Sequence, residues 1–189
     1  NYTDSLLNNR TSSVFIEKLL SENYGFGLFS ATNFKSSIFR QALFQKQRLE
    51  KKQESNQSAV ENLAVFLSST ENKQPWFAYV DLDIAQKVRE QELTYLEKEQ
   101  AYYAQQLMQL DDLLGQIFVQ LETQGLTDNT MVIITAEHGY TFQMTQDELT
   151  HYFARDEIQV PMIIRWSGLT IGEKTKLSSH IDLIPALMS

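Results

Sequence analysis

The chain contains no cysteine, three prolines and only seven glycines in 189 residues. Without cysteine, this segment cannot build a disulfide scaffold, a zinc–thiolate site or a cysteine nucleophile. No apolar run reaches the roughly 18–20 residues that a membrane-spanning helix needs. The sequence therefore predicts neither a disulfide-stabilised module nor a membrane span within these residues.

Acidic residues outnumber basic ones by 24 to 16, which gives a formal net charge of −8. A surface of this sign repels the phosphate backbone, so we expect no nucleic-acid partner. The hydrophobic fraction of 42% and the charged fraction of 21% are typical of a globular protein. We predict a single domain over residues 1–189. The first residue is Asn1 rather than Met, and we expect the chain to be an N-terminally truncated piece of a longer protein.

Helical and strand patterns alternate along the chain. Helices are predicted over residues 13–22, 36–44, 59–69, 90–124 and 182–188. Strands are predicted over residues 26–31, 76–82, 131–135 and 159–166. Residues 131–135 are continuously apolar, a pattern typical of strands covered on both faces. Residues 159–166 repeat this pattern, and Pro161 indicates either an edge strand or the start of the strand. The predicted fold class is α/β, with helices layered on both sides of a mixed, mostly parallel central sheet.

Residues 45–58 are polar and offer no apolar face to bury. We interpret them as a polar surface loop. The basic residues within this loop allow two interpretations, contact with an anionic headgroup or acidic partner and simple solvation of the loop.

Glu137 and His138 directly follow the apolar strand 131–135, and Gly139 follows them. In open α/β sheets, ligands bind at the carboxyl ends of strands. Neighbouring side chains in a strand point to opposite faces, so this pair converges only if the backbone leaves β geometry, which Gly139 permits. A carboxylate and an imidazole are suitable ligands for a divalent metal. Two ligands do not define a site, so two interpretations of this pair stay open, an exposed turn and one half of a metal site.

Three further residues are weaker candidates for a site. Asp81 and Asp83 end the predicted strand 76–82 and reach the same carboxyl edge of the sheet, where they would support the metal ligands. His151 lies in the loop 140–157. It either binds a substrate oxyanion or merely contacts solvent.

Five short motifs stand in a distinctive order in the second half of the chain. They are LDDLLG at 110–115, DNT at 128–130, AEHG at 136–139, VPMIIRW at 160–166 and HIDLIPAL at 180–187. This order resembles the C-terminal part of the sulfatase and alkaline-phosphatase superfamily, in which the apolar strand ends in S-D-H-G or S-D-N-G. The resemblance covers nearly the whole chain and implies a sulfatase-like fold.

Residues 24–44, YGFGLFSATNFKSSIFRQALF, are similar to one subfamily, the YejM type. Its members are inner-membrane proteins of Gram-negative bacteria with a periplasmic sulfatase-like domain. This resemblance implies a periplasmic location and a sensor or regulator role in lipopolysaccharide and outer-membrane homeostasis. Its implied partners are lipopolysaccharide, its lipid A part, or inner-membrane regulatory proteins. It also implies that the hydrolase site is degraded.

The resemblance assigns Glu137 and His138 as ligands of a divalent metal in the full-length protein, which would be Ca, Mg, Mn or Zn. Glutamate in place of the family's aspartate keeps the carboxylate and lengthens it by one methylene. Sulfatases also place a Lys or His before the V-P strand to hold the ester oxyanion. Here that loop has no Lys, so His151 and Arg155 become the substrate-binding candidates.

The family's nucleophile and its other acidic metal ligands lie upstream of the motifs found here. We therefore predict that residues 1–189 alone contain no catalytic residue, bind no metal and have no esterase activity. For the full-length protein two functions stay open. One is a catalytically impaired regulator, and the other is a metal-dependent sulfuric or phosphoric ester hydrolase or phospho-headgroup transferase. An open sheet edge in the isolated piece also predicts self-association.

Overall fold

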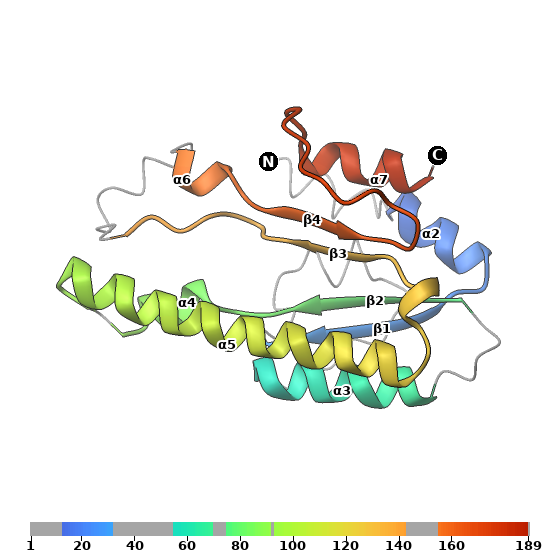
Figure 1. The fold of residues 1–189 in the computed structure, drawn as a ribbon, viewed down its shortest axis with the longest axis horizontal. Coiled ribbons are helices and arrows are strands. Elements are labelled where there is room, and N and C mark those ends of the chain that lie inside the picture. Colours follow the sequence, from blue (N-terminus) through green and yellow to red (C-terminus); the bar gives the residue numbers. More distant parts are fainter. Residues whose placement is uncertain (1–12, 32–54, 70–74, 92, 143–154, 189) are drawn as a thin grey trace, which may run out of the picture. The chain divides into compact units, whose positions relative to one another are not determined.

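A computed structural model of the chain describes residues 13–31, 55–69, 75–91, 93–142 and 155–188 (Figure 1). The chain divides into two compact units. The first unit comprises Asn1–Asp81 and Thr170–Ser189, and the second comprises Leu82–Leu169. The predicted helix over 36–44 lies outside the described residues. In the part that is described, no helix is both long and apolar enough to cross a membrane.

A parallel pair of strands forms the centre of the first unit. Strand β1 (Gly25–Ser30) pairs with β2 (Trp76–Asp81) in a register that sets Gly25 beside Trp76 and Ser30 beside Asp81. Both strands are aromatic and apolar, as the sequence predicts. The unit also contains helices α2 (Val14–Ser21), α3 (Asn56–Ser69) and α7 (His180–Met188).

Helices α2 and α3 pack against opposite faces of this sheet. One face supplies the partners of the buried Ile16 of α2, which include Phe26, Leu28, Phe77 and Tyr79. The other face supplies Phe29 and Trp76, whose rings lie 5.8 Å and 6.1 Å from the ring of Phe66 on α3. Because side chains alternate along a strand, these two sets define two sides, and the unit has a helix–sheet–helix layering.

The second unit contains a shorter, antiparallel sheet. Strand β3 (Val132–Thr135) pairs with β4 (Met162–Arg165), so that Val132 lies beside Arg165 and Thr135 beside Met162. The other elements of this unit are α4 (Ala85–Arg89), α5 (Leu96–Thr123), the 3-10 turn η2 (Thr127–Asn129) and α6 (Arg155–Ile158). Strand β4 begins directly after Pro161, three residues after the predicted start at 159, which agrees with Pro161 as the start of the strand.

Burial of this second sheet differs from the prediction. Residues 132–134 of β3 are half-buried, and all four residues of β4 are exposed. The prediction that both strands are covered on both faces is therefore wrong for this structure. The physical reason is that, among the described elements, no helix packs closely against either strand, and the faces of a strand are covered by helices or a second sheet rather than by its neighbours in the sheet.

The predicted helix over 90–124 is also wrong at its start. The chain turns at residues 90–91, and the long helix α5 begins only at Leu96. No glycine or proline marks this break. It follows the buried Val88, which is 1% exposed, so packing of α4 overrides the local helical preference. Within the N-terminal half of α5, Glu99 and Gln106 are buried.

Helix α3 begins three residues before the predicted start at 59. Ser55 and Ser58 cap it reciprocally, since the Ser58 N–H donates to Ser55 Oγ at 3.0 Å and the Ser55 N–H donates to Ser58 Oγ at 2.8 Å. The polar-loop prediction is therefore wrong for residues 56–58, which are helical. Residues 45–54 lie outside the described part of the chain.

The two units end a helix in the same way. After α2, Asn23 adopts a φ of 61°, and the Tyr24 N–H donates to Leu19 O at 3.0 Å. After α5, Gly125 adopts a φ of 67°, and the N–H of residue 126 donates to the oxygen of residue 121 at 2.8 Å. Both are left-handed C-terminal caps that satisfy otherwise free carbonyls.

Candidate functional site

The chain bends at Glu137 and His138, immediately after β3. At Gly139 it meets α6, where the Gly139 N–H donates to Glu157 O at 2.8 Å. A Cβ on Gly139 would overlap the main-chain oxygen of Asp156. The glycine is therefore required by the close approach of another backbone rather than by a left-handed φ.

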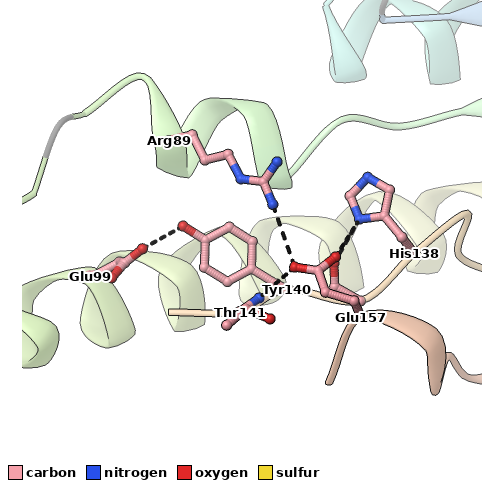
Figure 2. A network of polar contacts seen from close by, with 7 residues as sticks. Arg89, Glu99, His138, Tyr140, Thr141 and Glu157 are labelled. Atoms are coloured by element: carbon pink, nitrogen blue, oxygen red, sulfur yellow. Dashed lines mark hydrogen bonds and ion pairs between the residues drawn. The ribbon is translucent and has the colours of Figure 1, made fainter. Parts of the chain in front are cut away.

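The carboxylate of Glu157 is the centre of a polar network at this bend (Figure 2). Its Oε1 accepts a hydrogen bond from the Thr141 N–H at 3.2 Å and lies 3.7 Å from Arg89 Nη2. Its Oε2 lies 3.6 Å from His138 Nδ1. The Glu157 side chain is only 12% exposed, so these partners compensate the loss of water around a charged group.

The hydrogen bond of His138 defines which ring nitrogen carries hydrogen. His138 Nδ1 lies 2.7 Å from Gly139 O. A carbonyl oxygen only accepts, so Nδ1 must be the donor. In the neutral imidazole, Nε2 is then free of hydrogen and keeps its lone pair. The side chain is 45% exposed, which leaves this nitrogen able to meet a ligand.

An aromatic cluster supports the network from the side of α5. Tyr140 is buried, and its hydroxyl donates to Glu99 Oε1 at 2.6 Å. Its ring stacks on Tyr103 with centroids 4.9 Å apart, and Phe142 contacts both rings edge-on. The Arg89 guanidinium lies over the Tyr140 ring at 5.4 Å. Burial and, secondarily, the Glu99 carboxylate raise the pKa of Tyr140 far above its usual value.

The predicted metal ligands occupy neighbouring but different environments. His138 takes part in the network, whereas Glu137 is exposed. Among the described residues, no three His, Asp or Glu side chains come together as a metal-binding group. The local chemistry still fits a cation on His138, because metal-binding histidines commonly donate their other ring N–H to a carbonyl or carboxylate. The assignment of Glu137 and His138 stays a prediction.

Three of the other predicted site residues lie within the described part of the chain. Arg155, the exposed first residue of α6, donates from Nε to Gln159 Oε1 at 2.8 Å. Asp81 belongs to the first unit, where Ser30 Oγ donates to its carboxylate at 2.8 Å. Asp83 is half-buried just before α4. His151 lies outside the described residues. Their predicted roles stay predictions.

Five residues of the network were not among the sequence candidates. They are Arg89, Glu99, Tyr140, Thr141 and Glu157. Arg89 and Glu157 come from segments far from the Glu-His pair along the chain, and no spacing links them to it. The only local signal was Tyr140, an aromatic residue one position beyond the Glu-His-Gly motif, where a polar tip on an apolar ring often marks a buried hydrogen bond.

The layered helices and strands define an α/β protein, and the Glu-His-Gly bend follows one of its strands. A family model described as Sulfatase matches residues 5–189. Because this match covers nearly the whole chain, the chain belongs to the sulfatase family. The predicted membership is thereby confirmed.

Two relatives match along the full chain. An uncharacterized protein of Haemophilus influenzae is 47% identical over 192 residues, which cover 100% of this chain and 30% of that protein. The inner membrane protein YejM of Salmonella typhimurium is 26% identical over 189 residues, which cover 99% of this chain and 31% of YejM. The chain thus spans less than a third of the length of these relatives.

A solved structure supports the fold. The lipoteichoic acid synthase LtaP from Listeria monocytogenes aligns with a TM-score of 0.55 at 14% identity, covering 82% of this chain and 46% of that one. At this identity the likeness concerns the fold alone. It confirms the predicted sulfatase-like α/β class.

Proposed function

We propose that this chain is part of a periplasmic, sulfatase-like domain of a membrane-anchored protein of the YejM type. In this proposal the domain is a sensor or regulator in lipopolysaccharide and outer-membrane homeostasis and does not itself hydrolyse esters. Its partners are lipopolysaccharide, through its lipid A part, or regulatory proteins of the inner membrane. The match to YejM over 99% of the chain supports the membrane-anchored parent and the envelope location.

The charge balance at the bend is the observation that carries the non-catalytic role. Among the described residues of this network, Arg89 and His138 are the groups that can carry positive charge, and both lie within 4 Å of the single carboxylate of Glu157. Glu137 adds a second carboxylate next to them. Two carboxylates thus oppose one fixed guanidinium. A sulfate or phosphate ester needs an excess of positive charge where its negative charge grows, and these residues do not supply it.

A metal-dependent ester hydrolase or phospho-headgroup transferase is the second candidate function. The observation that favours it is the orientation of His138, which holds Nδ1 on a carbonyl and leaves Nε2 as a lone-pair donor. His138 and Glu137 would hold Ca²⁺, Mg²⁺, Mn²⁺ or Zn²⁺, with the remaining ligands and the nucleophile outside residues 1–189. When bound, such a cation would neutralise negative charge on the ester oxygens.

Metal analysis of the full-length protein, combined with point variants, separates the two functions. The purified protein is analysed for bound divalent metal and assayed with an aryl sulfate and an aryl phosphate. In parallel, lipopolysaccharide is measured in cells that carry a deletion of the domain, Glu137→Ala, His138→Ala or the control Glu173→Ala. Glu173 is an exposed carboxylate outside the bend.

The regulator function predicts that the deletion alters lipopolysaccharide levels, whereas Glu137→Ala and Glu173→Ala behave as wild type. It also predicts no stoichiometric metal and no turnover. The hydrolase function predicts one or more metal ions per chain and loss of turnover in Glu137→Ala and His138→Ala only. Turnover of either ester by residues 1–189 alone would contradict both.

A further inference from the structure

Glu157 contacts the bend after β3 with both its main chain and its side chain. Its carbonyl oxygen accepts from the Gly139 N–H at 2.8 Å, and its Oε1 accepts from the Thr141 N–H at 3.2 Å. His138 immediately precedes the first of these contacts along the chain, and its Nδ1 lies 3.6 Å from Oε2. One residue of α6 therefore fixes the segment that directly follows the histidine and also lies beside the imidazole ring (Figure 2).

The carboxylate also affects which nitrogen of His138 carries hydrogen. Gly139 O accepts from Nδ1–H, and the negative Oε2 on the same side of the ring favours hydrogen on that nitrogen as well. Without Glu157, the carbonyl of Gly139 would be the one remaining contact of the ring among those described, and the exposed side chain would gain rotational freedom. A histidine ligand needs this orientation, because the lone pair must point at the cation.

Arg89 holds the carboxylate itself in place. Its Nη2 lies 3.7 Å from Oε1, and its guanidinium lies over the ring of Tyr140. Tyr140 in turn donates to the buried Glu99 on α5. The position of Glu157 is thus tied through Arg89 to the aromatic cluster, and through its main chain to the bend.

We propose that Glu157 is the positioning residue for His138. It keeps the imidazole in the Nδ1–H tautomer, so that Nε2 is presented as a ligand for a divalent cation. The cation part of this statement rests on the second candidate function above, whereas the tautomer part rests on the described contacts alone. Its role is to act through His138, and it does not contact the cation.

The experiment uses the full-length protein with ¹⁵N-labelled histidine. Spectra at a pH above the usual histidine pKa report the tautomer of neutral His138, whose signals are assigned by their absence in His138→Asn. The variants are Glu157→Gln, which keeps the shape and an acceptor for the Thr141 N–H, and Glu157→Ala. Asp156→Asn, at an exposed carboxylate one residue away on α6, is the matched control. Titration with Mn²⁺ gives cation affinity for each variant.

We expect wild type and Asp156→Asn to show Nδ1–H and equal Mn²⁺ affinity. Glu157→Gln should populate the Nε2–H form and bind Mn²⁺ roughly 10–100-fold more weakly. An unchanged tautomer in a folded Glu157→Gln protein would overturn the proposal. If Glu157→Ala unfolds, Glu157→Gln decides alone. If wild type binds no Mn²⁺, the cation site of the second candidate function is refuted, and the tautomer shift still decides the role of Glu157.

Discussion

The sheet of β1 and β2 and the sheet of β3 and β4 differ in what covers them. In the first, helices α2 and α3 pack on opposite faces, and core residues such as Phe29 and Leu63 are less than a tenth exposed. In the second, every residue of β4 is exposed, although MIIR and VIIT are richer in β-branched residues than GFGLFS. An apolar sequence thus indicates that a strand needs to be covered. Whether the strand is buried depends on helices or strands from another part of the chain.

The relatives are more than three times as long as this chain, since it spans 30% and 31% of them. In a parent protein of that length, which is part of the proposed function, we expect further elements to cover β4. Self-association of residues 1–189 through an open sheet edge stays a prediction.

The largest expected effect is the difference in stability loss between a substitution in α3 and one in β4. Leu63, on α3, is 4% exposed, and Ile163, on β4, is 56% exposed. In residues 1–189, Leu63→Ala should lower the free energy of unfolding by about 2–5 kcal/mol, and Ile163→Ala by about 0.5 kcal/mol or less. Urea denaturation measures both. Equal losses of unfolding free energy in the two variants would contradict the difference in burial between α3 and β4. A larger loss for Ile163→Ala in the full-length protein than in residues 1–189 would show that β4 is covered by residues outside this chain.

A second test asks whether the stability of the region around β3 depends on the contact between the bend and α6 rather than on strand pairing. Gly139→Ala should cost about 1–3 kcal/mol, because the added Cβ overlaps the main chain of Asp156. Gly115→Ala is the control, since a Cβ at this position of α5 meets no atom within 4 Å and should stabilise the helix by about 0.5–1 kcal/mol. Faster exchange of the residue 139 amide in the first variant alone would report release from α6. Similar effects of both variants would count against the close contact.

The third test concerns the aromatic cluster that lies against this bend. Tyr140→Phe removes the hydroxyl that donates to the buried Glu99, and we expect a loss of about 1–2 kcal/mol at neutral pH. Tyr95→Phe, at a residue 65% exposed, should change stability little. Thermal unfolding of the two variants gives the comparison. A neutral Tyr140→Phe would show that the cluster is held by ring packing alone.

The same variant yields a prediction for alkaline pH. The folded state raises the pKa of Tyr140, so the folded protein keeps its proton after the unfolded chain begins to lose it at about pH 10. The contribution to stability is therefore complete below that pH and declines above it. Wild type and Tyr95→Phe should lose stability more steeply above pH 10 than Tyr140→Phe. Parallel profiles of stability against pH for all three proteins would contradict the raised pKa of Tyr140.

The smallest expected effect compares the helix ends of the two units. Asn23→Gly should stabilise the end of α2 by a few tenths of a kcal/mol, because glycine adopts positive φ without a steric cost. Gly125→Asn should weaken the end of α5 by a similar amount. Precise chemical denaturation resolves the opposite signs. Changes of the same sign would show that local context, rather than the shared cap, dominates.

The sequence predicts most elements because their patterns are local. The strands at 25–30 and 76–81 and the helix ending near Gly125 lie within a residue or two of prediction. The break before α5 was missed, since no residue there disfavours a helix and the cause is packing around Val88.

The candidate site was predicted only in part, for a related reason. His138 was found because it follows an apolar strand. Glu157, its partner, comes from a separate helix and carries no pattern that distinguishes it from other surface carboxylates. Contacts between distant segments depend on the completed fold, so a single sequence leaves them unspecified.

The close contact at Gly139 changes how a short motif should be interpreted in related sequences. Selection for a folded chain is enough to retain this glycine, because any side chain there collides with α6. The exposed Glu137 has no such constraint from packing. A related protein could therefore lose its chemistry and still keep the glycine. For telling active members of the family from inactive ones, the carboxylate before the histidine is informative and the glycine after it is not.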